Sequence, residues 1–355
     1  GVPTAFSGTY GKGAPVIGIL AEYDALSGLS QEGGCAQPTP IIPGGPGHGC
    51  GPNQLGAGSL AAALAVKKYL EPKGGRGTVI FYGCPGEEGG AGKAFMAREN
   101  EFAKLDAAFC WHPGDVNAVS TGSCNCSIQI EFIFKGIASH AAGSPHLGRS
   151  ALDAVELMNS GVQYLREHVP DSDRIHYAIT DAGGVSPNVV QAKAKVLYMI
   201  RSNNVKNAWK LVERVRNISK GAALMTDTTV SEQFIDGTAD LVPNFELETL
   251  LYQEFEKLGV PSYTEDELAL AQKLMDSYEN PDPGLPGKGY ATDPEVAAFI
   301  KEHSSNGTKP LNDFLIPYKP NGKASMGSTD VGDVSWQTPT AQIGVVGFAS
   351  KAPGH

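Results

Sequence analysis

Four stretches of the chain carry side chains that can bind a metal ion or transfer a proton. They are EYDAL (22–26) together with GHGCG (47–51), GCPGEEGG (83–90), WHPGD (111–115) and SKAPGH (350–355). They offer a cysteine thiolate, imidazoles and carboxylates, a borderline-soft donor set that suits Zn²⁺ or a similar divalent metal. Because each stretch ends or follows an apolar run, we predict a metal site assembled from several strand ends.

The glutamate pair is the most informative of these features. Adjacent glutamates are usually solvated surface residues, but Glu87 and Glu88 directly follow a buried strand and are flanked by Pro85-Gly86 and Gly89-Gly90. Adjacent side chains that leave a strand point in opposite directions. We therefore expect one glutamate to bind metal while the other faces the reacting water. His112 is open to two interpretations, a metal ligand or a histidine satisfied within the core.

The elements that would position these residues form an α/β layer. Nearly continuous apolar runs predict buried strands, and alanine-rich or amphipathic segments between them predict helices. In a parallel or mixed sheet with crossover connections, ligands collect outside the carboxyl ends of the strands, so the four stretches should converge on one sheet edge. The predicted strands are 15–23, 78–83, 107–112 and 341–348, and the predicted helices are 56–75 and 91–102.

The middle of the chain has a different pattern. Strand and helix periodicities alternate there in the order β-α-β-β-α-β, which is the ferredoxin-like unit. The fold class expected is a mixed sheet with helices on both faces plus an inserted ferredoxin-like α+β lid or dimerisation domain. The domain boundaries expected are 1–125 and 241–355 for the metal-binding domain and 126–240 for the insertion, with further helices near 244–258 and 264–278.

Composition narrows the class of protein. The formal net charge of −10 disfavours nucleic acid and anionic membranes as partners, although a local cationic pocket for a carboxylate stays possible. No apolar run is long enough to cross a bilayer, which predicts a soluble, cytoplasmic protein. The six cysteines lie within the first 126 residues at spacings that fit no disulfide framework, so we expect reduced thiols.

Several motifs resemble, in order and spacing, those of the M20 metallopeptidase superfamily. They are EYDALSGLSQ, GHGCG with NQLG, CPGEEGGAGKA, FKGIASHAAGSPHLGRSALDA, SPNVVQAKAKVLYMIR and MGSTDVGDVSW, and they span essentially the whole chain. The resemblance implies a metal-dependent amidohydrolase with Mn²⁺ or Zn²⁺, one or two ions. It further implies cleavage of an N-acyl amino acid or a dipeptide-like amide such as p-aminobenzoyl-glutamate, and a homodimer or heterodimer formed through the lid.

The resemblance also implies roles for single residues. Glu87 matches the general base, which takes a proton from metal-activated water and passes it to the leaving amine. On the lid, His140 matches a histidine that reaches an active site, commonly that of the partner subunit, and steadies the oxyanion. Asn188 and Arg201 match positions near the substrate carbonyl and carboxylate. The metal ligands implied are Cys50, Glu88, His112 and His355.

One position departs from the family pattern. The family reads Cys-Gly-His, with the histidine as a further ligand, whereas this chain has Cys50-Gly51-Pro52. His48 could move in, a water or ion could fill the gap, a single metal could bind, or catalysis could be lost. A metal-poor, non-catalytic ligand-binding or partner subunit of a hetero-oligomeric hydrolase is therefore the alternative hypothesis. A thiol hydrolase that uses Cys50 with His48 or His112 is a third one.

A loop near the end of the chain adds two acidic residues. Asp330 and Asp333 lie in the glycine-rich stretch GSTDVGDVSW (327–336), ahead of the last predicted strand. Aspartates in such loops often cap the backbone. The functional interpretation is a loop that orients the metal ligands or contacts substrate.

Overall fold

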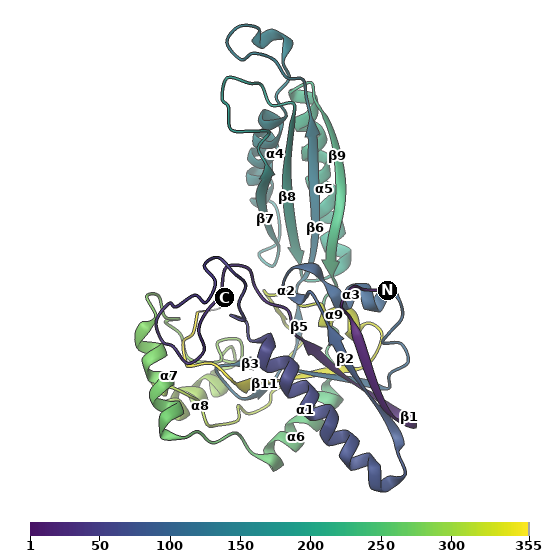
Figure 1. Cartoon of the computed structure of the whole chain (residues 1–355), viewed down its shortest axis with the longest axis vertical. Coiled ribbons are helices and arrows are strands. Elements are labelled where there is room, and N and C mark those ends of the chain that lie inside the picture. The colour runs from purple at the N-terminus through teal and green to yellow at the C-terminus, as the bar shows by residue number, and fades with distance from the viewer. Residues whose placement is uncertain (354–355) are drawn as a thin grey trace. The chain divides into compact units, whose positions relative to one another are not determined.

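The computed structural model describes residues 1–353, which form two compact units. The first unit contains residues 1–123, 242–325 and the segment from 333 onward, and the second contains residues 124–241 and 326–332. The elements, labelled in Figure 1, are β1 (Phe6–Glu22), α1 (Pro52–Leu70), β2 (Arg76–Cys84), α2 (Glu87–Gly90), α3 (Gly92–Arg98), β3 (Ala107–Gly114), β4 (Ala118–Val119), β5 (Ser123–Cys124), β6 (Cys126–Lys135), α4 (Ala151–Arg166), β7 (Arg174–Asp181), β8 (Lys193–Ser202), α5 (Val205–Met225), β9 (Thr229–Thr238), α6 (Phe245–Leu258), α7 (Glu265–Ser277), α8 (Pro294–His303), β10 (Ala324–Ser325), α9 (Val331–Ser335) and β11 (Thr340–Val346).

The first unit is built on a mixed five-stranded sheet. Its strand order is β2-β1-β3-β11-β4. Strand β4 runs antiparallel to β11, and residues 6–12 of β1 pair with 83–76 of β2 in descending order, which is also antiparallel. Residues 16–22 of β1 pair in parallel with 78–84 of β2, and β3 pairs in parallel with both β1 and β11. The carboxyl ends of β1, β2, β3 and β11 therefore meet at one edge of the sheet, which is where the predicted site residues follow the strands.

Both faces of this sheet are covered. On one face, α1 packs through Ala63 and Leu70 against Ile19 of β1 and Val79 of β2. Successive strand residues alternate between faces, so Tyr82 of β2 points to the opposite face, where its ring contacts Phe102 edge-on at 5.2 Å between centroids. The segment after α3 supplies this second cover, and the strands between are buried, as their continuous apolar sequence predicts.

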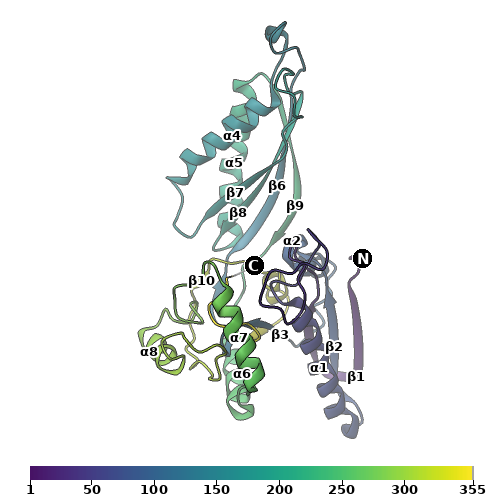
Figure 2. The same cartoon turned by 60° about the vertical axis from the view of Figure 1, so that its left-hand side comes forward.

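The second unit is a four-stranded antiparallel sheet with two helices on one face. The order β7-β8-β6-β9, with the chain path β6-α4-β7-β8-α5-β9, is the ferredoxin-like arrangement. Figure 2 shows α4 and α5 on the same side of the strands. Alternate residues of β6 face these helices and are buried, whereas the residues between them are partly exposed. Among the described residues of this unit, no helix covers the opposite face of the sheet.

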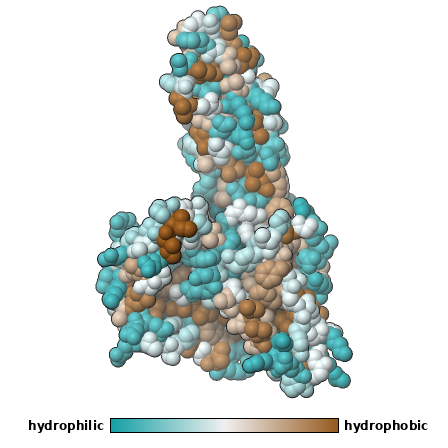
Figure 3. Space-filling view, in the orientation of Figure 1, coloured by the Kyte–Doolittle hydropathy of each residue, from teal (hydrophilic) through white to brown (hydrophobic). Residues whose placement is uncertain are grey.

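The surface of this second unit is mixed in polarity. On the face seen in Figure 3, hydrophobic residues are scattered among hydrophilic ones. Several large apolar side chains on the outer strands are exposed, among them Tyr177, Ile179 and Phe234.

The fold class predicted from the sequence is confirmed, and most elements fall within a few residues of their predicted ranges. Helix α1 begins earlier than predicted, at Pro52, because proline is well accommodated at the first position of a helix, where its missing N–H has no partner to lose. Helix α8 was not predicted, although Asp293 caps it and Pro294 opens it. The predicted insertion 126–240 lies within 124–241; the separate segment 326–332 that joins it was not foreseen.

None of the helices among the described residues is long and apolar enough to cross a membrane. The cytoplasmic location stays a prediction.

Candidate metal centre and catalytic site

The loop that carries Cys50 is shaped by glycine and proline. Gly51 adopts a left-handed conformation, with φ 90°, just before α1. A Cβ at this position would lie 2.6 Å from the Pro113 ring, so a larger residue would clash. Pro52 then starts the helix and is buried. This tight turn brings Cys50 against the end of β3, where His112 lies.

Cys50 joins two other predicted ligands. Its Sγ lies 3.5 Å from Nε2 of His112, and its thiol donates a hydrogen bond to the carboxylate of Glu88. The His112 Nδ1–H donates to the carbonyl oxygen of Pro113 at 2.7 Å. Because that carbonyl only accepts, Nδ1 carries the proton and Nε2 presents its lone pair toward Cys50, which is the tautomer a metal-binding histidine needs.

The acidic surroundings strongly disfavour a Cys50 thiolate in the absence of a cation. Burial raises the pKa of the Cys50 thiol to about 12, and the negative charges of Glu88, Glu87 and Glu22 act in the same direction. A nucleophilic cysteine needs a lowered pKa and an electropositive setting, so this geometry opposes the thiol-hydrolase hypothesis. A divalent cation is the natural partner for a thiol in such a setting, because binding would displace the proton.

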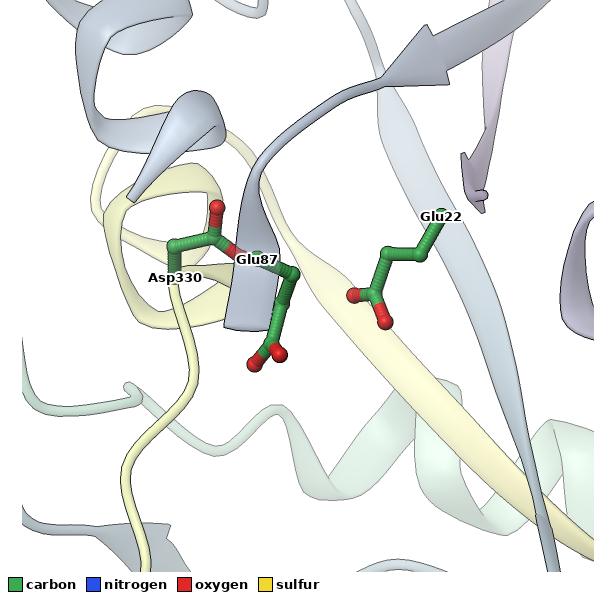
Figure 4. A group of neighbouring side chains, drawn as sticks. All are labelled: Glu22, Glu87 and Asp330. Carbon is green, nitrogen blue, oxygen red and sulfur yellow. The ribbon is translucent and has the colours of Figure 1, made fainter. Parts of the chain in front are cut away.

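The two glutamates separate, but not for the predicted reason. They do not leave a strand; they form the first turn of the short helix α2, where successive side chains are about 100° apart. Glu88 turns to Cys50, whereas a carboxylate oxygen of Glu87 lies within 4.8 Å of one from Glu22 at the end of β1. Figure 4 shows Glu87 and Glu22, together with the buried Asp330 of the 326–332 segment, which belongs to the second unit.

Asp24 ties the glutamate turn to the end of β1. Its Oδ2 accepts a hydrogen bond of 2.9 Å from the backbone N–H of Glu88. Its Oδ1 is buried and has no hydrogen-bond partner within the described residues. A buried carboxylate oxygen without a donor is costly, so a cation or an ordered water fits this position.

These residues fit a divalent metal. Thiolate, imidazole nitrogen and carboxylate oxygens meet at one sheet edge, and an excess of carboxylates surrounds them. In the part of the chain that the structure describes, the ligand atoms of Cys50, Glu88 and His112 do not all lie within 4.8 Å of one another, as they would around one ion. His355 lies outside the described residues. His48 is exposed, and it does not belong to a group of possible metal ligands within the described residues.

The predicted lid residues fall into two groups within the second unit. His140 and Asn188 lie together: His140 pairs with Val189 in an isolated bridge, and the Asn188 carbonyl accepts from the N–H of Ala141 at 3.0 Å. Arg201 is at the far end of β8, about 27 Å along the strand from Lys193 at 3.4 Å per residue. One small amide cannot contact both groups within a single copy of the unit.

Arg201 belongs to a cluster of positive charge that the sequence did not reveal. Arg174 lies directly opposite it in the β7–β8 register, and His176 is on the same face two residues along. Burial and then the charges of Arg201, Arg166 and Arg174 lower the pKa of His176. Within the described residues, the hydrogen bonds of these arginines go to uncharged groups: Arg201 donates to Ser328 Oγ at 2.7 Å and Arg174 to the Asp173 carbonyl at 2.7 Å.

A buried ion pair was also missed from the sequence. Lys93 of α3 has a fully buried side chain, and its Nζ lies 2.6 Å from Oε1 of Glu22. The sequence does show a lysine just after the glycine-rich turn that follows the glutamates. Nothing in the sequence, however, indicates that its partner is Glu22, which lies 71 residues away.

Comparisons with known proteins identify relatives of this chain. Residues 122–225 match the family model described as a peptidase dimerisation domain of the M20 type. The chain is 47% identical over its full length to one of the subunits of p-aminobenzoyl-glutamate hydrolase from Escherichia coli, and covers 73% of that protein. Over 75% of its length it is 30% identical to mouse Xaa-Arg dipeptidase, of which it spans 60%.

A solved structure supports the fold. The YXEP protein of Bacillus subtilis, described as a dinuclear metal-binding peptidase from the M20 family, superposes with a TM-score of 0.52 at 17% identity, covering 98% of this chain and 77% of the other. At this identity the likeness concerns the fold alone. The full-length identity to the hydrolase from Escherichia coli carries the relationship further, and the chain belongs to the M20 metallopeptidase superfamily of amidohydrolases.

Proposed function

We propose that this protein is a metal-dependent amidohydrolase that cleaves the amide bond of an N-acyl amino acid or dipeptide-like substrate such as p-aminobenzoyl-glutamate. The observation that carries the proposal is the Cys50 thiol, held between His112 and Glu88 at the edge of the sheet. The named substrate is that of the relative with 47% identity, transferred here as a proposal.

The metal would be held by Cys50, Glu88 and His112, with His355 as a further ligand from the end of the chain. Mn²⁺ and Zn²⁺ both suit these donors. A divalent ion supplies Lewis-acid charge, which polarises an amide carbonyl and lowers the pKa of water. The hydrogen bond from His112 Nδ1 to the Pro113 carbonyl orients the imidazole for this task.

Glu87 acts as the general base. It accepts a proton from the attacking water as the water oxygen bonds to the amide carbon, and it returns that proton to the amine nitrogen as the C–N bond breaks. The position of Glu87 supports this role, because the turn of α2 directs Glu88 to Cys50 and leaves Glu87 as the neighbouring carboxylate.

The second unit binds the acyl amino acid and joins two copies of the chain. His140, supplied by one copy, steadies the oxyanion and Asn188 contacts the carbonyl, while Arg201 binds the substrate carboxylate. The separation of His140 and Asn188 from Arg201 along β8 supports a site to which two copies contribute. The arginines opposite each other on β7 and β8 provide the cationic surface that a carboxylate needs in a chain of net charge −10.

Pro52 favours a second candidate, a metal-poor and non-catalytic subunit of a hetero-oligomeric hydrolase. The proline removes an imidazole from the site and is built into the start of α1. A shared two-metal site that lacks one ligand binds at least one ion weakly. In that case the protein would bind a catalytic partner chain through the second unit.

One experiment separates the two candidates. Protein purified without chelator is analysed for divalent metal per chain, then assayed with Mn²⁺ or Zn²⁺ against p-aminobenzoyl-glutamate, other N-acyl amino acids and dipeptides. At least one tightly held ion together with release of the free amine supports the enzyme. Less than one ion per chain and no turnover with any added metal would overturn it in favour of the non-catalytic protein.

A further inference from the structure

A cavity of about 220 Å³ lies at the β4 edge of the sheet in the first unit. Its lining comes from β4, from the start of α8 and from the segment 316–323, all within that unit. Pockets for drug-sized ligands span roughly 300–1,000 Å³. This cavity therefore suits a smaller molecule, of the size of a benzene ring with one substituent.

The cavity is separate from the candidate metal centre. Ala118 of β4 lines it and pairs with Gly344 of β11, which in turn pairs with His112 of β3. Two strand spacings of about 4.8 Å each thus separate Ala118 from His112 across the sheet. Strand β4 then runs antiparallel to β11, so Thr121, which also lines the cavity, lies further from the carboxyl edge where His112 and Cys50 meet.

The inner wall of the cavity is apolar. Val119, Val296 and Ile316 line it and are at most 4% exposed. Tyr290 and Tyr318 add two aromatic rings to the same lining, and such rings favour edge-to-face or offset contact with another ring. The wall therefore suits the body of a small aromatic ligand, whose apolar surface would leave water on binding.

The rim of the cavity carries a positive charge that no acid balances. Lys319 contacts the carboxylates of both Asp293 and Glu295, so its charge is compensated. Lys323 lines the same cavity and is exposed, and within the described residues it forms no ion pair. Asn321 lies beside it: its Oδ1 accepts the backbone N–H of Lys323 at 3.0 Å, and its NH₂ group is directed elsewhere as a donor.

An apolar wall with one uncompensated cation at its rim recognises an amphiphilic ligand with a single negative charge. We propose that this cavity binds a small aromatic monocarboxylate of the benzoate class, with its ring against Val119, Val296 and Ile316 and its carboxylate toward Lys323 and Asn321. The inference depends neither on the proposed metal site nor on amide cleavage.

The probe for this site is sodium benzoate, titrated by calorimetry into the full-length protein as purified. For a ligand of about nine non-hydrogen atoms we expect a Kd on the order of 1 mM. Benzamide keeps the ring without the charge, and acetate keeps the charge without the ring. Each should bind at least about fivefold more weakly than benzoate, because each loses one of the two contacts.

A charge reversal at the rim locates the ligand. Lys323→Glu should weaken benzoate binding by about fivefold or more, since a carboxylate there repels the ligand. The position is exposed, so the fold should persist, as circular dichroism would verify. The matched control is Lys301→Glu, which makes the same change in net charge at an exposed residue of α8 outside the cavity and should leave the Kd unchanged. Arg201→Gln, in the second unit, should also leave it unchanged.

The remaining outcomes would overturn the inference. They are no binding at benzoate concentrations up to about ten times the expected Kd, equal affinity for benzamide and benzoate, and a Kd that Lys323→Glu leaves unchanged. Weakening by Arg201→Gln alone would assign benzoate to the second unit, and loss of binding after treatment with a chelator would assign it to the metal centre. Protein that binds benzoate but neither metal nor amide substrate would overturn the proposed function alone, so the two failures are distinguishable.

Discussion

The candidate metal site of the first unit and the cationic face of the second unit are made in opposite ways. The first collects half-buried carboxylates, a thiol and an imidazole from turns at the ends of parallel strands. The second places arginines and a histidine along regular antiparallel strands, on the sheet face that no helix of that unit covers. The first arrangement suits a metal cation, and the second suits an anion such as a carboxylate group. The proposed amidohydrolase, whose substrate has a carboxylate near the amide bond, would use both.

The two regions also differ in how their helices begin. In the second unit, Ser150 and Asn204 cap α4 and α5 with side-chain hydrogen bonds. In the first unit, α1 and α2, the two helices at the candidate metal site, follow the left-handed Gly51 and Gly86 and have no side-chain cap, whereas α6, α7 and α8 are capped by Asn244, Thr264 and Asp293. Glycine therefore stands where the backbone must turn tightly to bring Cys50 and the glutamates together.

The largest effect expected is on catalysis in the first unit. Glu87→Gln should lower kcat by about 10²–10⁴-fold, because the amide cannot accept the proton of water, while the metal content stays at the wild-type value. Glu88→Gln should instead lower the metal content, since it removes a ligand oxygen. Steady-state kinetics and metal analysis on the same preparations make the distinction. Wild-type turnover in Glu87→Gln would remove Glu87 from its assigned role.

In the second unit we expect an effect on binding. Arg201→Gln and Arg174→Gln should each raise KM by about tenfold for a substrate with a free carboxylate and change kcat little, because a charge-assisted hydrogen bond is lost in ground state and transition state alike. The matched control is the same substrate with its carboxylate converted to an amide, for which both variants should equal wild type. An equal loss on both substrates would show that the arginines support the fold of the unit and not the ligand.

Pro52→His tests the departure from the family pattern. An imidazole at this position restores a donor next to Cys50, so the Kd for a second divalent ion should fall by about tenfold or more. Histidine is also compatible with the first turn of a helix, so the fold should persist, as circular dichroism would verify. If neither metal stoichiometry nor activity rises, the site of the natural protein already works with one ion.

The sequence predicted the scaffold better than the site. Strand β6 was located because Ile128, Ile130, Phe132 and Phe134 occupy every second position, with Gln129 and Glu131 between the first three of them, and that period reports which face is buried. The meeting of Cys50, Glu88 and His112 followed from the rule that parallel strands end at one edge. By contrast, the pairing of Arg174 with Arg201 depends on strand register, which no local pattern specifies.

Of the remaining differences, one has a local cause and one has a long-range cause. The glutamates were expected to leave a strand, but left-handed Gly86 ends the extended backbone and starts α2, so helical rotation separates their side chains. The pairing of Lys93 with Glu22 joins elements 71 residues apart. Such contacts arise only when the layers pack, so no local pattern in the sequence specifies them.

The smallest effect expected tests whether the two units are separable in function. Ser150 Oγ accepts the backbone N–H of Asp153 at 3.0 Å, so Ser150→Ala should lower the free energy of unfolding by about 1 kcal/mol. Denaturant titration measures that loss, and Ser150→Thr, which keeps the acceptor, is the control. Because the cap stabilises only the second unit, the Kd for Mn²⁺ should match wild type. Weaker Mn²⁺ binding in Ser150→Ala, but not in Ser150→Thr, would mean that the stability of the second unit affects the metal site. The two regions would then differ in their residues but would not function independently.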